Sequence, residues 1–272
     1  MLGFLKTKPV LDDESTLWLF DAFTWSLQNF NAEVFYQQTR LVQPSNQFFP
    51  GRESSADGMA NLILEQVKNY AGLNHWPSRA ADANSSAIAP GPVMIENPQR
   101  SLSNVAGKVA ANTVDGQNEL VIPYHPSQLA KPESLIANYA TILSYYLAQT
   151  ADQPPPGGEP FLPQATELVA VFLGFGIMLA NSAYTFRGGC GSCYNPLAER
   201  SASLSQDEAS YALAIFCALK NLPSNEVLPH LKSYLRPVFK RAVNEIRKSR
   251  QLELLRLRPE SAAATLSHQP MR

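Results

Sequence analysis

Two cysteines three positions apart are the first candidates for chemistry in this sequence. Cys190 and Cys193 enclose a glycine and a serine, which is the spacing of a redox-active pair or of half a zinc site. A zinc site needs four ligands, so Cys217 and a histidine from elsewhere would have to complete it. A thioredoxin-like pair would need a βαβ context that the neighbouring sequence lacks. Two readings stay open: a metal or redox-active thiol site, or two loop cysteines with no shared role.

Residues 140–145, A-T-I-L-S-Y, match the alanine and leucine of a zinc-peptidase helix motif but lack its metal ligands. In an A-H-E-L-x-H helix, two histidines four residues apart share one face and hold zinc, while the glutamate activates water. Here Thr141, Ile142 and Tyr145 stand at those three positions. An alcohol and a phenol, whose pKa is about 10, stay protonated at neutral pH, and isoleucine cannot act as a base. The segment therefore argues against zinc-dependent hydrolysis.

A downstream segment adds to this pattern. Residues 166–176 read T-E-L-V-A-V-F-L-G-F-G, and residues 180–182 read A-N-S. Together with 140–145, they resemble an uncharacterised bacterial family of zincin-like proteins, in which an A-H-E-L-x-H helix precedes T-D-L-x-x-V-x-x-G-x-G and A-N-S. The resemblance covers most of residues 12–222. It implies a zincin-like helical core in which Glu167 replaces the acidic third metal ligand.

Because the ligands of the first helix are missing, the resemblance predicts a degenerate member of that family. Thr141, Ile142, Tyr145 and Glu167 are then former metal-site positions, with no catalytic residue and no resident metal. We expect Thr141, Tyr145 and apolar neighbours to fill the former cleft. Each match also has a structural explanation: Glu167 as a first-turn acid favoured by the helix dipole, and Gly174 and Gly176 as points of close helix approach.

Other catalytic signatures are missing from the sequence. The four histidines, at positions 75, 125, 230 and 268, are scattered, although His125 precedes the degenerate helix and is placed to face the same cleft. There is no Gly-x-Ser-x-Gly nucleophile elbow and no Walker or dinucleotide phosphate loop. Hydrolase and nucleotide-binding classes therefore have no motif to support them.

The apolar spacing predicts a mainly helical α+β fold with a small antiparallel sheet. Asp115-Gly116, between apolar runs at 109–114 and 118–122, is a hairpin signal. Residues 168–180 are thirteen apolar residues, short of the roughly 18 to 20 that span a bilayer, so we expect a buried core helix and no transmembrane segment. Helices are expected from Asp12, from Asp57 to about Gly72, from Pro132, from Pro163, and after a capping box at Ser205 and Glu208.

The chain of 272 residues, 45% of them hydrophobic, can bury a sizeable core. We expect a domain over 1–222 with a mobile excursion at about 77–103, a basic helical extension over 223–258, and a disordered tail over 259–272. The first ten residues lack the apolar run of a secretory signal, and three cysteines do not make an even disulfide framework. Both observations favour a cytoplasmic protein.

The formal net charge of −1 gives no overall basic field, but one segment is strongly basic. From Lys240 to Arg258, arginines and lysines surround an apolar stripe that includes Val238, Ala242 and Ile246. Such a helix suits an acidic protein, a nucleic acid or an anionic lipid, although a solvated charged face is commoner. The sequence thus favours a non-catalytic binding or scaffolding protein with an unidentified partner. The alternatives are the thiol site, in which zinc would be the cofactor, and a residual metal-dependent hydrolase that uses Glu167.

Overall fold

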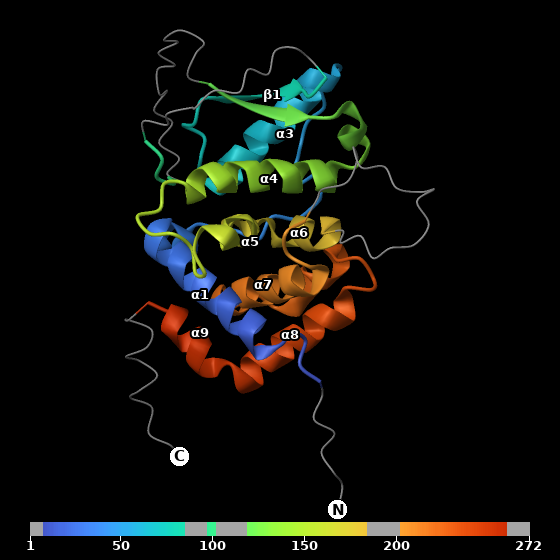
Figure 1. The fold of residues 1–272 in the computed structure, drawn as a ribbon. Helices are drawn as coiled ribbons and strands as arrows, with labels where there is room; N and C mark the ends of the chain where they lie inside the picture. Colours follow the sequence, from blue (N-terminus) through green and yellow to red (C-terminus); the bar gives the residue numbers. More distant parts are fainter. Residues whose placement is uncertain (1–7, 85–96, 102–118, 184–201, 260–272) are drawn as a thin grey trace, which may run out of the picture.

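The computed structural model describes residues 8–84, 97–101, 119–183 and 202–259 (Figure 1). The described residues form a mainly helical α+β structure, as the sequence predicts. The helices are α1 (Asp13–Asn29), α2 (Ala32–Gln37), α3 (Ala56–Ala71), α4 (Pro132–Ala148), α5 (Leu162–Ala170), α6 (Gly176–Ser182), α7 (Gln206–Leu219), α8 (Arg236–Ser249) and α9 (Gln251–Leu257). Figure 1 shows α3 and the strands at one end, α8 and α9 at the other, and α4 to α7 stacked between them.

Several helices begin and end where local sequence signals place them. The Asp12 carboxylate accepts the Ser15 backbone N–H at 2.7 Å and caps α1. Before α7, Ser205 and Glu208 form the expected reciprocal capping box. Gly72 ends α3 with a φ of 76°, which a residue without a Cβ adopts at little cost. These boundaries were predictable because each depends on residues within one turn.

The most apolar segment, Glu159–Ser182, is long and apolar enough to cross a membrane by length and composition. It is a core segment here, because 83% of its apolar window is buried inside the protein. A turn of π-helix, Val171–Phe175, separates α5 from α6, and Gly174 within it has a φ of 104°. A Cβ on Gly174 would lie 2.1 Å from the Arg40 carbonyl oxygen. The prediction of a buried helix is confirmed, with a break that lets residues 40–42 approach.

The small sheet differs from the predicted hairpin. Strand β1 (Ser78–Asp82) pairs in parallel with β2 (Leu120–Tyr124), with Ser78 opposite Leu120 and Asp82 opposite Tyr124. The described sheet is therefore not antiparallel, and residues 109–116 lie outside the described part of the chain. Residues 78–82, within the mobile excursion expected at about 77–103, instead form β1, in which Ala80 and Ala81 are buried.

The C-terminal helices belong to the main hydrophobic core instead of forming an extension. Helix α8 packs on α7 through Phe239, Ala242 and Ile246, whose side chains are fully buried. Helix α9 packs along α1, and the Tyr36 hydroxyl donates to the Leu257 carbonyl at its end. Residues 260–272, expected to be disordered, lie outside the described residues. The surface of α8 and α9 is therefore held on a rigid support.

Two cations, the buried Arg100 and the half-buried Lys220, stabilise the C-terminal ends of three helices. Arg100 donates to the carbonyls of Ala71 (2.9 Å) and Phe30 (3.4 Å), at the ends of α3 and α1. Lys220 donates to the carbonyls of Phe35 (2.7 Å) and Tyr36 (2.6 Å) in the last turn of α2. Because helix C-termini carry partial negative charge, these contacts offset much of the cost of burying the two cations.

Candidate functional site

The three positions on α4 that the resemblance assigns to a former metal site are half-buried or exposed. The Thr141 hydroxyl donates to the Ala137 carbonyl of its own helix at 2.9 Å. Tyr145 is 45% exposed, and its ring contacts Tyr146. Ile142 is half-buried at the edge of the core. The expectation that Tyr145 fills a former cleft is wrong, because the side chain faces solvent.

Glu167, the expected counterpart of a third metal ligand, is buried and holds a loop in place. Its carboxylate oxygens accept the backbone N–H groups of Ser203 and Leu204, both at 2.9 Å. It lies in the middle of α5 instead of its first turn, so the helix-dipole explanation was also wrong. Glu167 therefore fixes the segment that leads into the capping box of α7. Sequence reasoning missed this role because the partners lie 36 residues further along the chain.

The A-N-S segment also has a structural role. The Asn181 amide on α6 donates to a Glu133 carboxylate oxygen at 2.7 Å and to the His230 carbonyl at 2.8 Å. The Asn181 side-chain oxygen accepts the Lys232 backbone N–H at 3.0 Å. One side chain thus joins α6 to the start of α4 and to the segment before α8. Gly176 allows α6 to approach Leu213 of α7, as expected for a close helix contact.

The candidate thiol site, Cys190 and Cys193, lies outside the described residues. Cys217 is buried in α7, and burial raises the pKa of its thiol to about 12, so it stays protonated at neutral pH. Within the described ranges, no group of three or more His, Cys, Asp or Glu side chains could hold a metal ion. His125 begins a 3-10 turn, where its backbone N–H donates to the Gln128 side chain.

Lysines and arginines are concentrated on α8 and α9. Between Arg236 and Arg258 the sequence holds eight lysines and arginines but only two glutamates, although the whole chain has a net charge of −1. Positive charge is thus concentrated in α8 and α9, the helices that Figure 1 shows at one end of the protein.

Helical spacing puts four of these cations around one side chain. Lys240, Arg241, Arg247 and Lys248 lie at positions −4, −3, +3 and +4 relative to Asn244, and residues at these offsets are neighbours on a helix surface. All five side chains are exposed, opposite the buried stripe of α8. We name these five residues the basic face of α8. The sequence had indicated the arrangement through Ala242 and Ile246, but Phe239 completes the buried stripe and Val238 is only half-buried.

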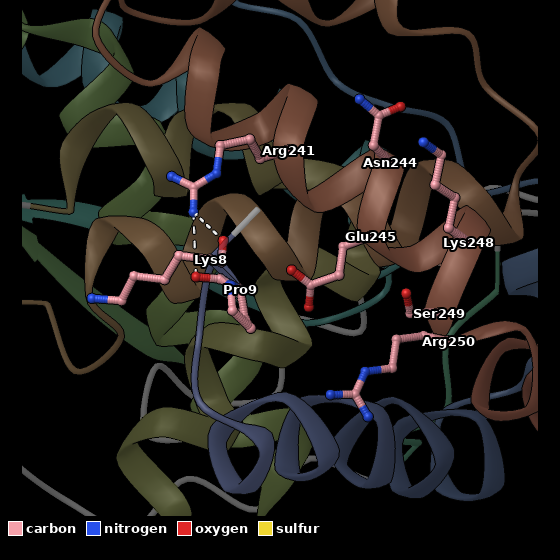
Figure 2. A pocket seen from close by; sticks show the side chains of 8 residues that line it. All are labelled: Lys8, Pro9, Arg241, Asn244, Glu245, Lys248, Ser249 and Arg250. Atoms are coloured by element: carbon pink, nitrogen blue, oxygen red, sulfur yellow. Dashed lines mark hydrogen bonds between the residues drawn. The ribbon is translucent and has the colours of Figure 1, made fainter. Parts of the chain in front are cut away.

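A cleft of about 310 Å³ lies beside the basic face, between α8 and the segment that leads into α1 (Figure 2). The Arg241 guanidinium spans it and donates to the carbonyls of Lys8 (2.8 Å) and Pro9 (3.2 Å). The residues that line it are Lys8, Pro9, Arg241, Asn244, Glu245, Lys248, Ser249 and Arg250. Sequence alone could not predict this cleft, because its two walls are more than 230 residues apart in the chain.

The acidic side chain of the cleft is held in fixed contacts. Glu245 accepts the Val10 backbone N–H at 3.1 Å and the Tyr211 hydroxyl at 3.0 Å, one on each carboxylate oxygen. Burial and the Glu245 charge both raise the pKa of Tyr211, so the phenol stays a hydrogen-bond donor. Arg250 forms ion pairs with Asp13 and Glu253. The cleft therefore contains a hydrogen-bonded Glu245 carboxylate, which keeps its negative charge, and cations along its edge, of which Arg250 is ion-paired.

Most of the cations on this surface have no acidic partner. Within the described part of the chain, Lys8, Lys240, Arg247, Lys248 and Arg256 form no ion pair, and all are exposed. A mobile exposed cation loses little hydration when it meets an anion, so it is available for an external partner.

No protein-family model, curated protein or solved structure matches this chain. The likeness to zincin-like proteins stays a prediction. The structure itself defines a mainly helical α+β protein in which Thr141 and Glu167 have structural contacts and α8 carries the basic face.

Proposed function

We propose that this is a non-catalytic binding or scaffolding protein that takes an anionic partner on the basic face of α8. The observation that supports it most strongly is the set of exposed cations around Asn244, which rest on a buried stripe and meet no acidic side chain in the described residues. A rigid helix that presents several cations in one arc favours a multivalent anion over a single charge.

The non-catalytic part of the proposal is supported by the contacts of the residues that a hydrolase would need. Glu167 accepts two backbone N–H groups, and Thr141 donates to its own helix, so neither is arranged around a reacting atom. Tyr145 lies at the surface. Casein hydrolysis by the purified chain that stops with a chelator would overturn this part.

The binding part is tested with fluorescein-labelled polyglutamate, followed by fluorescence anisotropy. The K240E/K248E variant reverses two charges on the basic face, whereas R40E/R52E reverses two exposed arginines elsewhere and is the matched control. We expect the first variant to weaken binding about ten-fold or more at low salt and the control to bind like the wild type. Equal weakening by both variants would mean that only net charge matters and would refute the assigned surface.

A further inference from the structure

Exposed leucines lie on α9, the helix that follows the basic face in the chain. In α9, Leu252 is 72% exposed and Leu255 is 36% exposed, whereas Leu254 and Leu257 are buried against the core. One side of α9 carries Leu252, Leu255 and Arg256, because Leu255 and Arg256 follow Leu252 by three and four residues. At this exposure Leu252 packs little against the described residues, so this arc combines exposed apolar and cationic groups.

A third exposed leucine lies on the neighbouring helix. Leu17 of α1 is 43% exposed and follows Asp13 by one helical turn. The Asp13 carboxylate pairs with Arg250, the residue between α8 and α9. Helix α9 then packs along α1. The packed helices α1 and α9 thus carry the three exposed leucines, Leu17, Leu252 and Leu255, near Arg250, where α8 ends.

We infer that the partner of this surface is an anionic lipid bilayer, contacted by the basic face of α8 and by Leu252 and Leu255 of α9. This inference rests on the proposed function and specifies its partner. Lipid headgroups supply negative charge in a plane, and the boundary below them accepts apolar side chains. A soluble acidic peptide or a nucleic acid would use the cations but would give the leucines no apolar environment.

Nearby acidic groups are mostly committed to internal contacts. Asp13 pairs with Arg250, Asp12 caps α1, and Glu253 pairs with Arg250 from the other side. Glu245 is held by Val10 and Tyr211. Glu14, exposed in the first turn of α1, and Asp21, exposed one turn after Leu17, are further acidic side chains near this junction. The net charge of this surface therefore remains positive where it would face a bilayer.

The test is co-sedimentation of the full chain with vesicles of phosphatidylcholine alone or with about 30% phosphatidylserine, a content that gives an anionic surface. We expect binding only to the anionic vesicles. L252S/L255S should weaken it about ten-fold. K240E/K248E should weaken it by roughly several hundred-fold, since each unit charge near such a surface contributes about five-fold and the variant changes the charge by four units. Y145S, which replaces an exposed side chain on α4, and R40E/R52E should bind like the wild type.

The outcomes separate the two proposals. If wild type binds polyglutamate but not anionic vesicles, or if L252S/L255S binds both equally well, the bilayer inference is overturned and the anionic-partner proposal stands. If wild type binds neither probe, both are refuted. Support for the bilayer requires that L252S/L255S loses vesicle binding while it keeps polyglutamate binding, with an unchanged circular-dichroism spectrum in every variant.

Discussion

Replacing Glu167 with alanine should destabilise the protein without affecting any bound metal. The carboxylate is 2% exposed and accepts two backbone N–H groups at 2.9 Å. A hydrogen bond to a charged group contributes about 1.5–3 kcal/mol, and a buried donor left unpaired costs about as much as the bond itself. We therefore expect Glu167→Ala to lower the free energy of unfolding by about 3–5 kcal/mol, out of the roughly 5–15 kcal/mol typical of a domain.

Glu167→Gln should have about half of that effect. The amide oxygen can still accept the N–H of Ser203 or Leu204, but the amide NH₂ group then faces the other donor. Glu159→Ala, which removes an exposed carboxylate from the turn before α5, is the control and should change the free energy of unfolding by less than about 0.5 kcal/mol.

The assay is urea unfolding followed by circular dichroism. For Glu167→Ala, the midpoint should fall by roughly 1–2 M urea while the denaturant slope stays constant. Loss of less than about 1 kcal/mol, together with loss of stoichiometric zinc from the purified chain, would show that Glu167 is a metal ligand and would refute the structural role.

Three further outcomes follow from the contacts in the core. Gly174→Ala should destabilise the protein by about 3 kcal/mol or more in the same urea assay. The added Cβ would lie 2.1 Å from the Arg40 carbonyl oxygen, and the φ of 104° is unfavourable for alanine. A change of less than about 1 kcal/mol would contradict this prediction. Cys217 can be tested in a variant whose other two cysteines are replaced by serine. At pH 8 it should react with Ellman's reagent about a thousand-fold more slowly in the folded chain than in the urea-unfolded chain, because burial raises its pKa to about 12. Rapid reaction in the folded state would show that the thiol is accessible. Burial also raises the pKa of Tyr36 to about 12, above its unfolded value of about 10, so its stabilising effect is complete below pH 10 and is lost as the pH rises toward 12. In urea titrations between pH 10 and 12, a Tyr36→Phe variant should therefore lose less stability than the wild type. Equal losses in the two proteins would refute this prediction.

Helix boundaries could be predicted from the sequence because their causes are local. The Asp12 cap and the box formed by Ser205 and Glu208 depend on side chains that reach three residues along the chain. The basic face of α8 was also indicated, since residues three and four apart share a face. The burial of residues 168–180 was predicted because thirteen apolar residues are too few to span a bilayer.

Features that depend on long-range contacts could not be predicted in this way. The parallel pairing of β1 with β2 joins segments about 40 residues apart, and nothing in either strand fixes the direction. The role of Glu167 depends on backbone N–H groups at positions 203 and 204, which carry no sequence signal. The expected burial of Tyr145 was wrong for a related reason: its exposure depends on which neighbours cover α4, and those neighbours are distant in the sequence.

Hydrogen–deuterium exchange of the full chain, with and without polyglutamate, tests the proposed binding surface most directly. We predict added protection within residues 236–258 and in the segment from Lys8 to Asp12 that forms the other wall of the cleft, and no change in α4 or α5. Protection centred on Thr141 and Tyr145, or protection spread evenly over the chain, would contradict the account.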